Sequence, residues 1–133
     1  MFLLDTNILS DLIRHPQGVI TARIAQVGEA SVATSVICAG ELGFGAARRS
    51  SQRLTEQLEA VLQRLPVLPL GDDADLHYGR LRADLARRGQ PIGANDMWIA
   101  AHALAIDATL VTDNVREFGR VEGLRVENWL RGS

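Results

Sequence analysis

Apolar residues along the chain occur in two kinds of run, and the two kinds alternate. Five short runs have the length and aliphatic content of buried strands, and they cover residues 1–4, 30–34, 66–70, 109–112 and 124–126. The stretches between them repeat apolar residues every three or four positions, as helices do, over residues 6–15, 17–27, 36–48, 51–65, 72–88 and 95–106. Strands that alternate with helices predict an α/β sandwich with a short parallel sheet of about five strands.

Several element ends carry residues that normally start or stop them. Ser35 precedes an apolar helix and can accept a hydrogen bond from its first turn as an N-cap. Gly89 can end the helix expected before it. The third strand contains Pro66 and Pro69, which have no N–H to donate to a neighbouring strand, so we expect it at an edge of the sheet.

Composition indicates one ordinary globular domain, which we place at residues 1–133. No apolar run approaches the roughly 20 residues of a membrane span. The first residues, Met-Phe-Leu-Leu-Asp, lack the basic start and long apolar run of a secretory signal. The single cysteine, Cys38, lies in an apolar helical stretch, so we expect it to be buried and reduced in a cytoplasmic protein.

The charge pattern limits the possible chemistry. A net charge of −2 argues against bulk attraction to nucleic acid, although a local basic rim is compatible with it. The sequence contains arginine but no lysine, which excludes reactions that need a lysine side chain.

Two acids end apolar strands. Asp5 follows the first run and Asp113 follows the fourth, and each precedes a residue that could begin a helix. Either could simply be a helix N-cap, a position that aspartate favours. In an open parallel sheet, however, the carboxyl ends of the strands form the usual ligand-binding edge.

Two more acids lie in the helices that follow strands. Glu41 is the one charged side chain between Val36 and Ala47, so it is either at an exposed margin or buried with a partner, because a lone buried charge is costly. Asp96 lies in the first turn of its helix, where it or Asn95 could cap the helix or interact with its dipole.

Together these acids predict a metal site. Asp5, Glu41, Asp96 and Asp113 occupy positions that can converge on one edge of a parallel sheet. Two carboxylates about 4 Å apart repel by roughly 4 kcal/mol, so a cluster of four must hold protons or a cation. Ligands that are all oxygen suit Mg²⁺ or Mn²⁺ better than Zn²⁺. Such a site can hydrolyse a phosphodiester.

Four segments resemble the motifs of PIN-domain ribonucleases, in the same order. They are Leu-Leu-Asp5-Thr6-Asn7, then Thr34-Ser35-Val36-Ile37 with Gly40-Glu41-Leu42, then Ile92-Gly93-Ala94-Asn95-Asp96, and Leu110-Val111-Thr112-Asp113-Asn114 with Arg116-Glu117-Phe118. The resemblance covers the whole chain. In its length and in these forms of the motifs, the chain is most similar to VapC-type toxins of bacterial type II toxin–antitoxin pairs.

The resemblance implies a Mg²⁺- or Mn²⁺-dependent endoribonuclease that is a homodimer. It implies an antitoxin partner that inserts an Arg or Lys toward the acidic pocket, with DNA bound only through that antitoxin. The four acids match the family's metal-holding quartet. We expect support for them from four polar neighbours, Thr6, Asn7, Thr112 and Asn114. Relatives often carry Asn or Arg at the position of Asp113.

A histidine and several arginines outside the four acids could also take part in the site. His102 lies about 120° around its helix from Asp96, and we interpret it as a packed structural histidine. Basic runs are usually solvated, but an RNA substrate would make Arg48, Arg49 and Arg116 candidate phosphate contacts.

Three alternative functions are considered. Receiver domains and haloacid-dehalogenase-type phosphatases share the fold class, but they need a lysine that this chain lacks. A PIN-like module that only binds DNA with its partner, as a repressor, is a non-enzymatic alternative. A PIN nuclease of RNA processing that is not a toxin is the third.

Overall fold

The computed structural model describes residues 1–131 and contains a five-stranded sheet with the order β3-β2-β1-β4-β5. All four neighbouring pairs are parallel. The strands are β1 (Phe2–Leu4), β2 (Val32–Ser35), β3 (Val67–Leu68), β4 (Thr109–Val111) and β5 (Val126–Glu127). The predicted α/β class, the parallel sheet and the edge position of the proline-flanked strand are confirmed.

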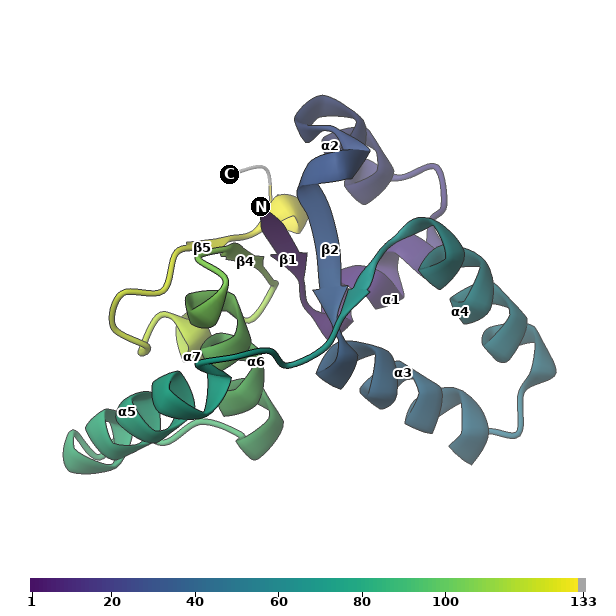
Figure 1. Ribbon diagram of the computed structural model, residues 1–133. Helices are drawn as coiled ribbons and strands as arrows, with labels where there is room; N and C mark the ends of the chain where they lie inside the picture. The colour runs from purple at the N-terminus through teal and green to yellow at the C-terminus, as the bar shows by residue number, and fades with distance from the viewer. Residues whose placement is uncertain (132–133) are drawn as a thin grey trace.

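The helices follow the strands in the expected alternation. They are α1 (Thr6–Arg14), α2 (Val19–Val27), α3 (Val36–Arg48), α4 (Gln52–Arg64), α5 (Ala74–Arg87), α6 (Ala94–Ala105) and α7 (Val115–Phe118), with 3₁₀ turns η1 (Glu29–Ser31) and η2 (Trp129–Arg131). Because the chain moves outward from β1 to β3 and then returns to β4, right-handed crossovers place α1–α4 on one face of the sheet and α5–α6 on the other. Figure 1 shows these two groups of helices on opposite sides of β1 and β2.

The carboxyl ends of the three central strands are level. Leu4 pairs with Thr34 on one side and with Val111 on the other. The residues that follow these pairs therefore leave the sheet at the same edge, toward which the arrows of β1 and β2 point in Figure 1. Asp5 and Thr112 are two of these residues.

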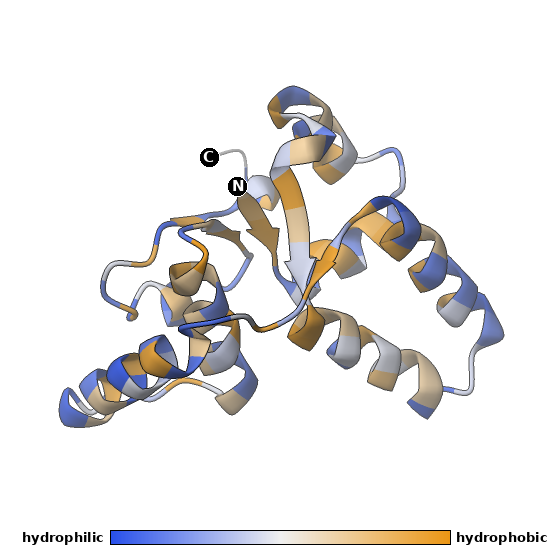
Figure 2. Cartoon of the chain, in the orientation of Figure 1, coloured by the Kyte–Doolittle hydropathy of each residue, from blue (hydrophilic) through white to orange (hydrophobic). Residues whose placement is uncertain are grey.

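The core is aliphatic and is centred on the sheet. Leu3, Leu4, Leu110 and Val111 have no exposed surface, and Ile99 packs among them from α6. Figure 2 shows apolar strands at the centre, with hydrophilic residues along the outer sides of α4 and α5. None of the helices within residues 1–131 combines the length and the hydropathy needed to cross a membrane.

Trp129 anchors the end of the described chain. Its side chain is 2% exposed, and its ring centroid lies 5.3 Å from that of Phe2 on β1. The Arg23 guanidinium of α2 lies 5.4 Å from the same ring, and the indole N–H donates to Glu127 Oε1 at 3.0 Å. Trp129 thus holds β1, α2 and β5 together.

Candidate active site

Asp5 lies where β1 ends and α1 begins. It is the N-cap of α1, and its Oδ1 accepts from the backbone N–H of Thr6 at 2.8 Å. Its Oδ2 accepts from Thr112 Oγ1 at 2.7 Å, and the Cys38 thiol lies 3.8 Å from Oδ1. Asp5 is only 4% exposed, and burial raises its pKa against these hydrogen bonds, with a further contribution from the charge of Glu41. The helix-cap and functional-site interpretations therefore apply to the same residue.

Glu41 projects from the middle of α3 and is half-buried with polar partners. Its Oε1 accepts from Thr6 Oγ1 at 2.7 Å, and its Oε2 accepts from Asn95 Nδ2 at 3.4 Å. Thr6 therefore binds Asp5 through its backbone and Glu41 through its side chain. One threonine sets the relative positions of two acids from different elements.

Asp96 lies in the first turn of α6, but neither it nor Asn95 is the cap, because the helix begins at Ala94 with Gly93 as N-cap. The pKa of Asp96 is raised to about 7. Burial is the largest cause, followed by a hydrogen bond with Glu117 and by the negative charges of Glu117, Asp5 and Glu41. Three of the four predicted acids are therefore within electrostatic reach of one another.

Glu117 is an acid of this cluster that sequence reasoning did not propose as a site residue. Its Oε1 accepts from the backbone N–H of Gly93 at 2.9 Å, and its Oε2 accepts from Asn114 Nδ2. Burial opposes ionisation, but the Gly93 N–H and the hydrogen bond with Asp96 lower the pKa of Glu117 overall. Asp96 and Glu117 thus share a proton that resides on Asp96.

Asp113 makes its contacts elsewhere. Its carboxylate accepts from Asn128 Nδ2 at 2.9 Å and lies 3.4 Å from Arg131 Nε. With His15 and Arg131 it lines a hollow beyond the carboxyl end of β4. The structure thus brings Asp5, Glu41 and Asp96 together with Glu117, and directs the carboxylate of Asp113 toward the C-terminal segment.

The predicted supporting residues join these groups. Asn7 Oδ1 accepts from the backbone N–H of Asp113 at 3.2 Å. Thr112 Oγ1 accepts from the backbone N–H of Asn114 at 3.0 Å while it donates to Asp5. The amide of Asn114 in turn reaches Glu117. A chain of hydrogen bonds therefore connects Asp5 with Glu117.

The carboxylates of the acidic cluster offer only oxygen donors to a cation. No three His, Cys, Asp or Glu side chains within residues 1–131 converge closely enough to enclose a metal ion. The negative charges of Asp5, Glu41 and Glu117 nevertheless act together on Asp96, and with burial they raise its pKa to about 7. An added Cβ at Gly93 would lie 3.5 Å from Asp96 Oδ2, so the missing side chain leaves that carboxylate open. A cluster of carboxylates has only oxygen ligands, and a cation would offset their negative charge. Such a set of ligands fits Mg²⁺ or Mn²⁺.

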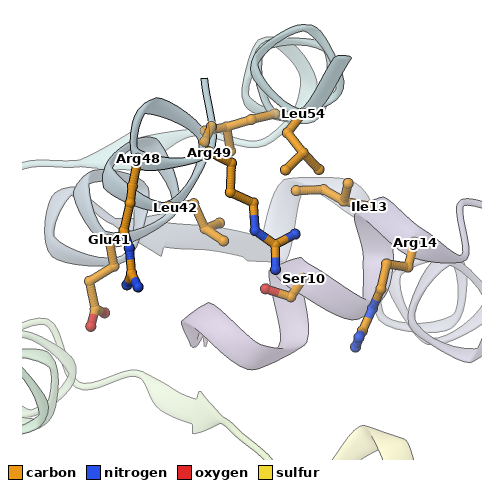
Figure 3. A pocket seen from close by; sticks show the side chains of 11 residues that line it. Ser10, Ile13, Arg14, Glu41, Leu42, Arg48, Arg49 and Leu54 are labelled. Atoms are coloured by element: carbon orange, nitrogen blue, oxygen red, sulfur yellow. The ribbon is translucent and has the colours of Figure 1, made fainter. Parts of the chain in front are cut away.

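The other candidates take the following positions. His102 is fully buried, and its Nδ1 lies 2.8 Å from Ser35 Oγ, as expected of a structural histidine. Arg48 and Arg49 line a groove that also includes Glu41, and Figure 3 shows all three side chains extending from α3. Arg116 is exposed on α7.

Comparison with known proteins gives consistent results. The family model described as "PIN domain" matches residues 2–124. "Ribonuclease VapC1" of Haemophilus influenzae strain R2866 is 35% identical over 133 residues, which cover 98% of this chain and 99% of that protein. "tRNA(fMet)-specific endonuclease VapC" of Shigella flexneri is 36% identical over 129 residues, which cover 96% and 97%.

A solved structure is also similar over nearly the whole chain. The crystal structure of VapBC2 from Rickettsia felis, bound to a DNA fragment from the promoter, contains a chain with a TM-score of 0.89 and 33% identity. The match covers 96% of this chain and 98% of that one.

Proposed function

The chain belongs to the PIN domain family, and on that premise we propose that it is a divalent-metal-dependent endoribonuclease that acts as the toxin of a toxin–antitoxin pair. The names of its relatives support the activity, and the whole of residues 1–133 would form the nuclease domain. The observation that carries the proposal is that Asp5, Glu41 and Asp96, from three different elements, lie within electrostatic reach of one another at one edge of the sheet.

We assign the cation, Mg²⁺ or Mn²⁺, to Asp5, Glu41 and Asp96, with Glu117 as a further carboxylate beside Asp96. When bound, it would supply Lewis-acid polarisation of a phosphoryl oxygen and charge that offsets the carboxylates. Asp113 belongs to the same edge of the sheet, where its backbone N–H orients Asn7.

The residues of the chain have distinct tasks in hydrolysis of the phosphodiester. Thr112 and the backbone of Thr6 hold both oxygens of Asp5, so this carboxylate needs no reorganisation. Glu41 is held by the side chain of Thr6. In the metal-free protein the pKa of Asp96 is about 7, so this carboxylate must give up a proton when it holds the cation.

Partners follow from the relatives. The Rickettsia felis structure is a complex of VapB and VapC with promoter DNA. We infer that this chain also has an antitoxin, that a cation of the antitoxin interacts with the acidic cluster, and that DNA is bound through the antitoxin. The family resemblance also supports a homodimer. Phe44 on α3 is 66% exposed and is available for such a contact.

Cleavage of RNA by the purified protein in Mn²⁺ tests the activity. We expect Asp5→Asn and Asp96→Asn to lower the rate by roughly 10²-fold or more, since each removes a carboxylate charge that would hold the cation. Asp75→Asn, on the exposed side of α5, is the matched control and should cleave like the parent. Cleavage that resists EDTA, or variants as fast as the parent, would show that the proposal is wrong.

The toxin role is tested in cells. Expression of the parent without a partner should arrest growth, and Asp96→Asn should not. An active purified nuclease that leaves growth unaffected would instead indicate an RNA-processing enzyme. A protein that cleaves no RNA but binds promoter DNA with its partner would indicate a repressor module.

A further inference from the structure

Four arginines near the acidic site have no acidic partner. Several arginines elsewhere pair with acids, for example Arg64 with Glu29 at 2.9 Å and Arg125 with Asp107 at 3.0 Å. Within residues 1–131, no ion pair and no side-chain hydrogen bond involves the following four, all of which are exposed: Arg14, Arg48, Arg49 and Arg53.

These four arginines lie along one continuous groove. A hollow of about 560 Å³ between α1, α3 and α4 is lined by Arg14, Arg48 and Arg49 and includes Glu41. A second hollow shares Arg14 and Arg49 with the first and extends it to Arg53. Figure 3 shows the guanidinium of Arg49 beside Ser10 of α1, and the side chain of Arg14 projecting from the same helix. Among the described residues that line the two hollows, Glu41 is the only acid.

We propose that this basic groove binds the phosphate backbone of the RNA substrate on one side of the cleavage site. The inference rests on the proposed function and specifies how that site holds its substrate. Phosphates away from the cation would be repelled by the carboxylates, and arginines that no acid within residues 1–131 neutralises provide the compensating charge. Glu41 lies at the acidic end of the groove, so a strand bound along it continues to the acids.

The lining also indicates how the strand is recognised. The apolar part of the groove consists of aliphatic residues such as Ile13, Leu42, Leu54 and Leu58, and no aromatic side chain is among the described lining residues. Bases therefore have no stacking platform there. The groove should contribute affinity through charge, with little dependence on base sequence.

The test compares two doubly substituted proteins of equal net charge. Arg14→Gln with Arg49→Gln removes two groove cations, and Arg80→Gln with Arg82→Gln removes two exposed cations of α5. Binding of fluorescein-labelled polyuridylate and polyadenylate is measured in EDTA at several salt concentrations. We expect the groove variant to bind both polymers about tenfold more weakly at low salt, and its log–log salt slope to fall by about 1.4, or about 0.7 per phosphate contact. The α5 variant should stay close to the parent.

Cleavage in Mn²⁺ gives a second measurement. The groove variant should have a higher KM for RNA with little change in kcat, because the lost contacts are the same in the bound substrate and the transition state. Equal RNA affinity and equal salt slope in both variants would overturn the inference. Polyglutamate that displaces RNA from the parent as well as unlabelled polyuridylate does, at equal charge, would also overturn it and assign the groove to an acidic peptide.

The test of the groove and the test of the proposed function can fail independently. Cleavage that persists in EDTA contradicts the metal-dependent mechanism but leaves the binding measurements valid. A variant that loses no RNA affinity leaves the acidic cluster as the cleavage site.

Discussion

At the scale of single residues, the acids of the site differ in environment although they lie close together. Asp5 is enclosed and held by donors at both oxygens, whereas Asp96 is half-buried and faces other carboxylates. A cation would compete with the proton on Asp96, because both neutralise the same oxygen atoms. The affinity for Mn²⁺ should therefore fall as the pH drops below about 7.

The titration of Asp96 should also make the free energy of unfolding of the metal-free protein depend on pH. The pKa of Asp96 is about 7 in the folded protein and near its ordinary value of 3.8 in the unfolded chain. Between these values the folded state holds more protons, so the free energy of unfolding falls as the pH rises toward 7. Asp96→Asn should therefore raise the stability at pH values above 7 by about 1 kcal/mol, allowing for solvent screening, and have little effect near pH 4.

Thermal unfolding in EDTA at several pH values checks this expectation. Asp75→Asn serves as the exposed control and should show no such pH dependence of its effect on Tm. Saturating Mn²⁺ should reverse the sign, because the parent then gains ligand binding that the variant lacks. An effect of Asp96→Asn that is the same across the pH range would contradict the assignment of the proton.

The sequence points to residues of the cluster where the ends of elements mark them. Asp5 follows the first strand, Asp96 lies in the first turn of a helix, and Thr112 donates a hydrogen bond to Asp5. Glu117 was not found, because its position depends on α7, a four-residue helix too short to show apolar periodicity. The direction of the Asp113 side chain also could not be predicted, because it depends on Asn128 and Arg131 at the far end of the chain.

At the scale of elements, the N-terminus of α6 organises one side of the site. Gly93 is the N-cap, its N–H donates to Glu117, and its missing side chain leaves space beside Asp96. Its φ of −58° is available to any residue, so the backbone conformation does not require glycine there, and the effect of the missing side chain is the space that it leaves.

Gly93→Ala should hinder access to the carboxylates beside it while it leaves the stability of the fold nearly unchanged. The added methyl would contact Asp96 Oδ2 at 3.5 Å and approach Glu117 Oε1 at 4.0 Å, which obstructs access to both carboxylates. We expect stability to change by less than about 0.5 kcal/mol, and the Mn²⁺ concentration for half-maximal cleavage to rise roughly tenfold. Gly79→Ala on α5, where a Cβ has open space, is the control and should leave the Mn²⁺ dependence unchanged. Equal Mn²⁺ dependence of the two variants would contradict this role for Gly93.

Element order and type were predictable because apolar spacing and cap residues agreed. Ser35 caps α3 through the N–H of Ile37, as expected, and the helix expected over 72–88 ends before Gly89, whose φ is 66°. Boundaries shifted where tertiary pairing decided them. The last strand was expected at 124–126 but lies at Val126–Glu127, because its register is set by pairing with β4. The brief turns η1 and η2 left no periodic signal.

At the scale of the whole molecule, Trp129 connects the last described turn with the first strand. Trp129→Ala would leave a cavity between β1, α2 and β5, and we expect it to lower the free energy of unfolding by about 3–5 kcal/mol. Urea denaturation measures the loss. Leu76→Ala, at an exposed apolar residue of α5, should change the stability much less. A loss below about 1 kcal/mol for Trp129→Ala would contradict the anchoring role.

The position of β1 at the centre of the sheet has a consequence for the order of events during synthesis. Strand β1 has β2 on one side, but its other neighbour, β4, is made only after α6. Asp5 receives its hydrogen bond from Thr112, 107 residues later in the chain. A nascent chain therefore has no complete acidic cluster until β4 and Thr112 have been made, which delays any RNA cleavage until then.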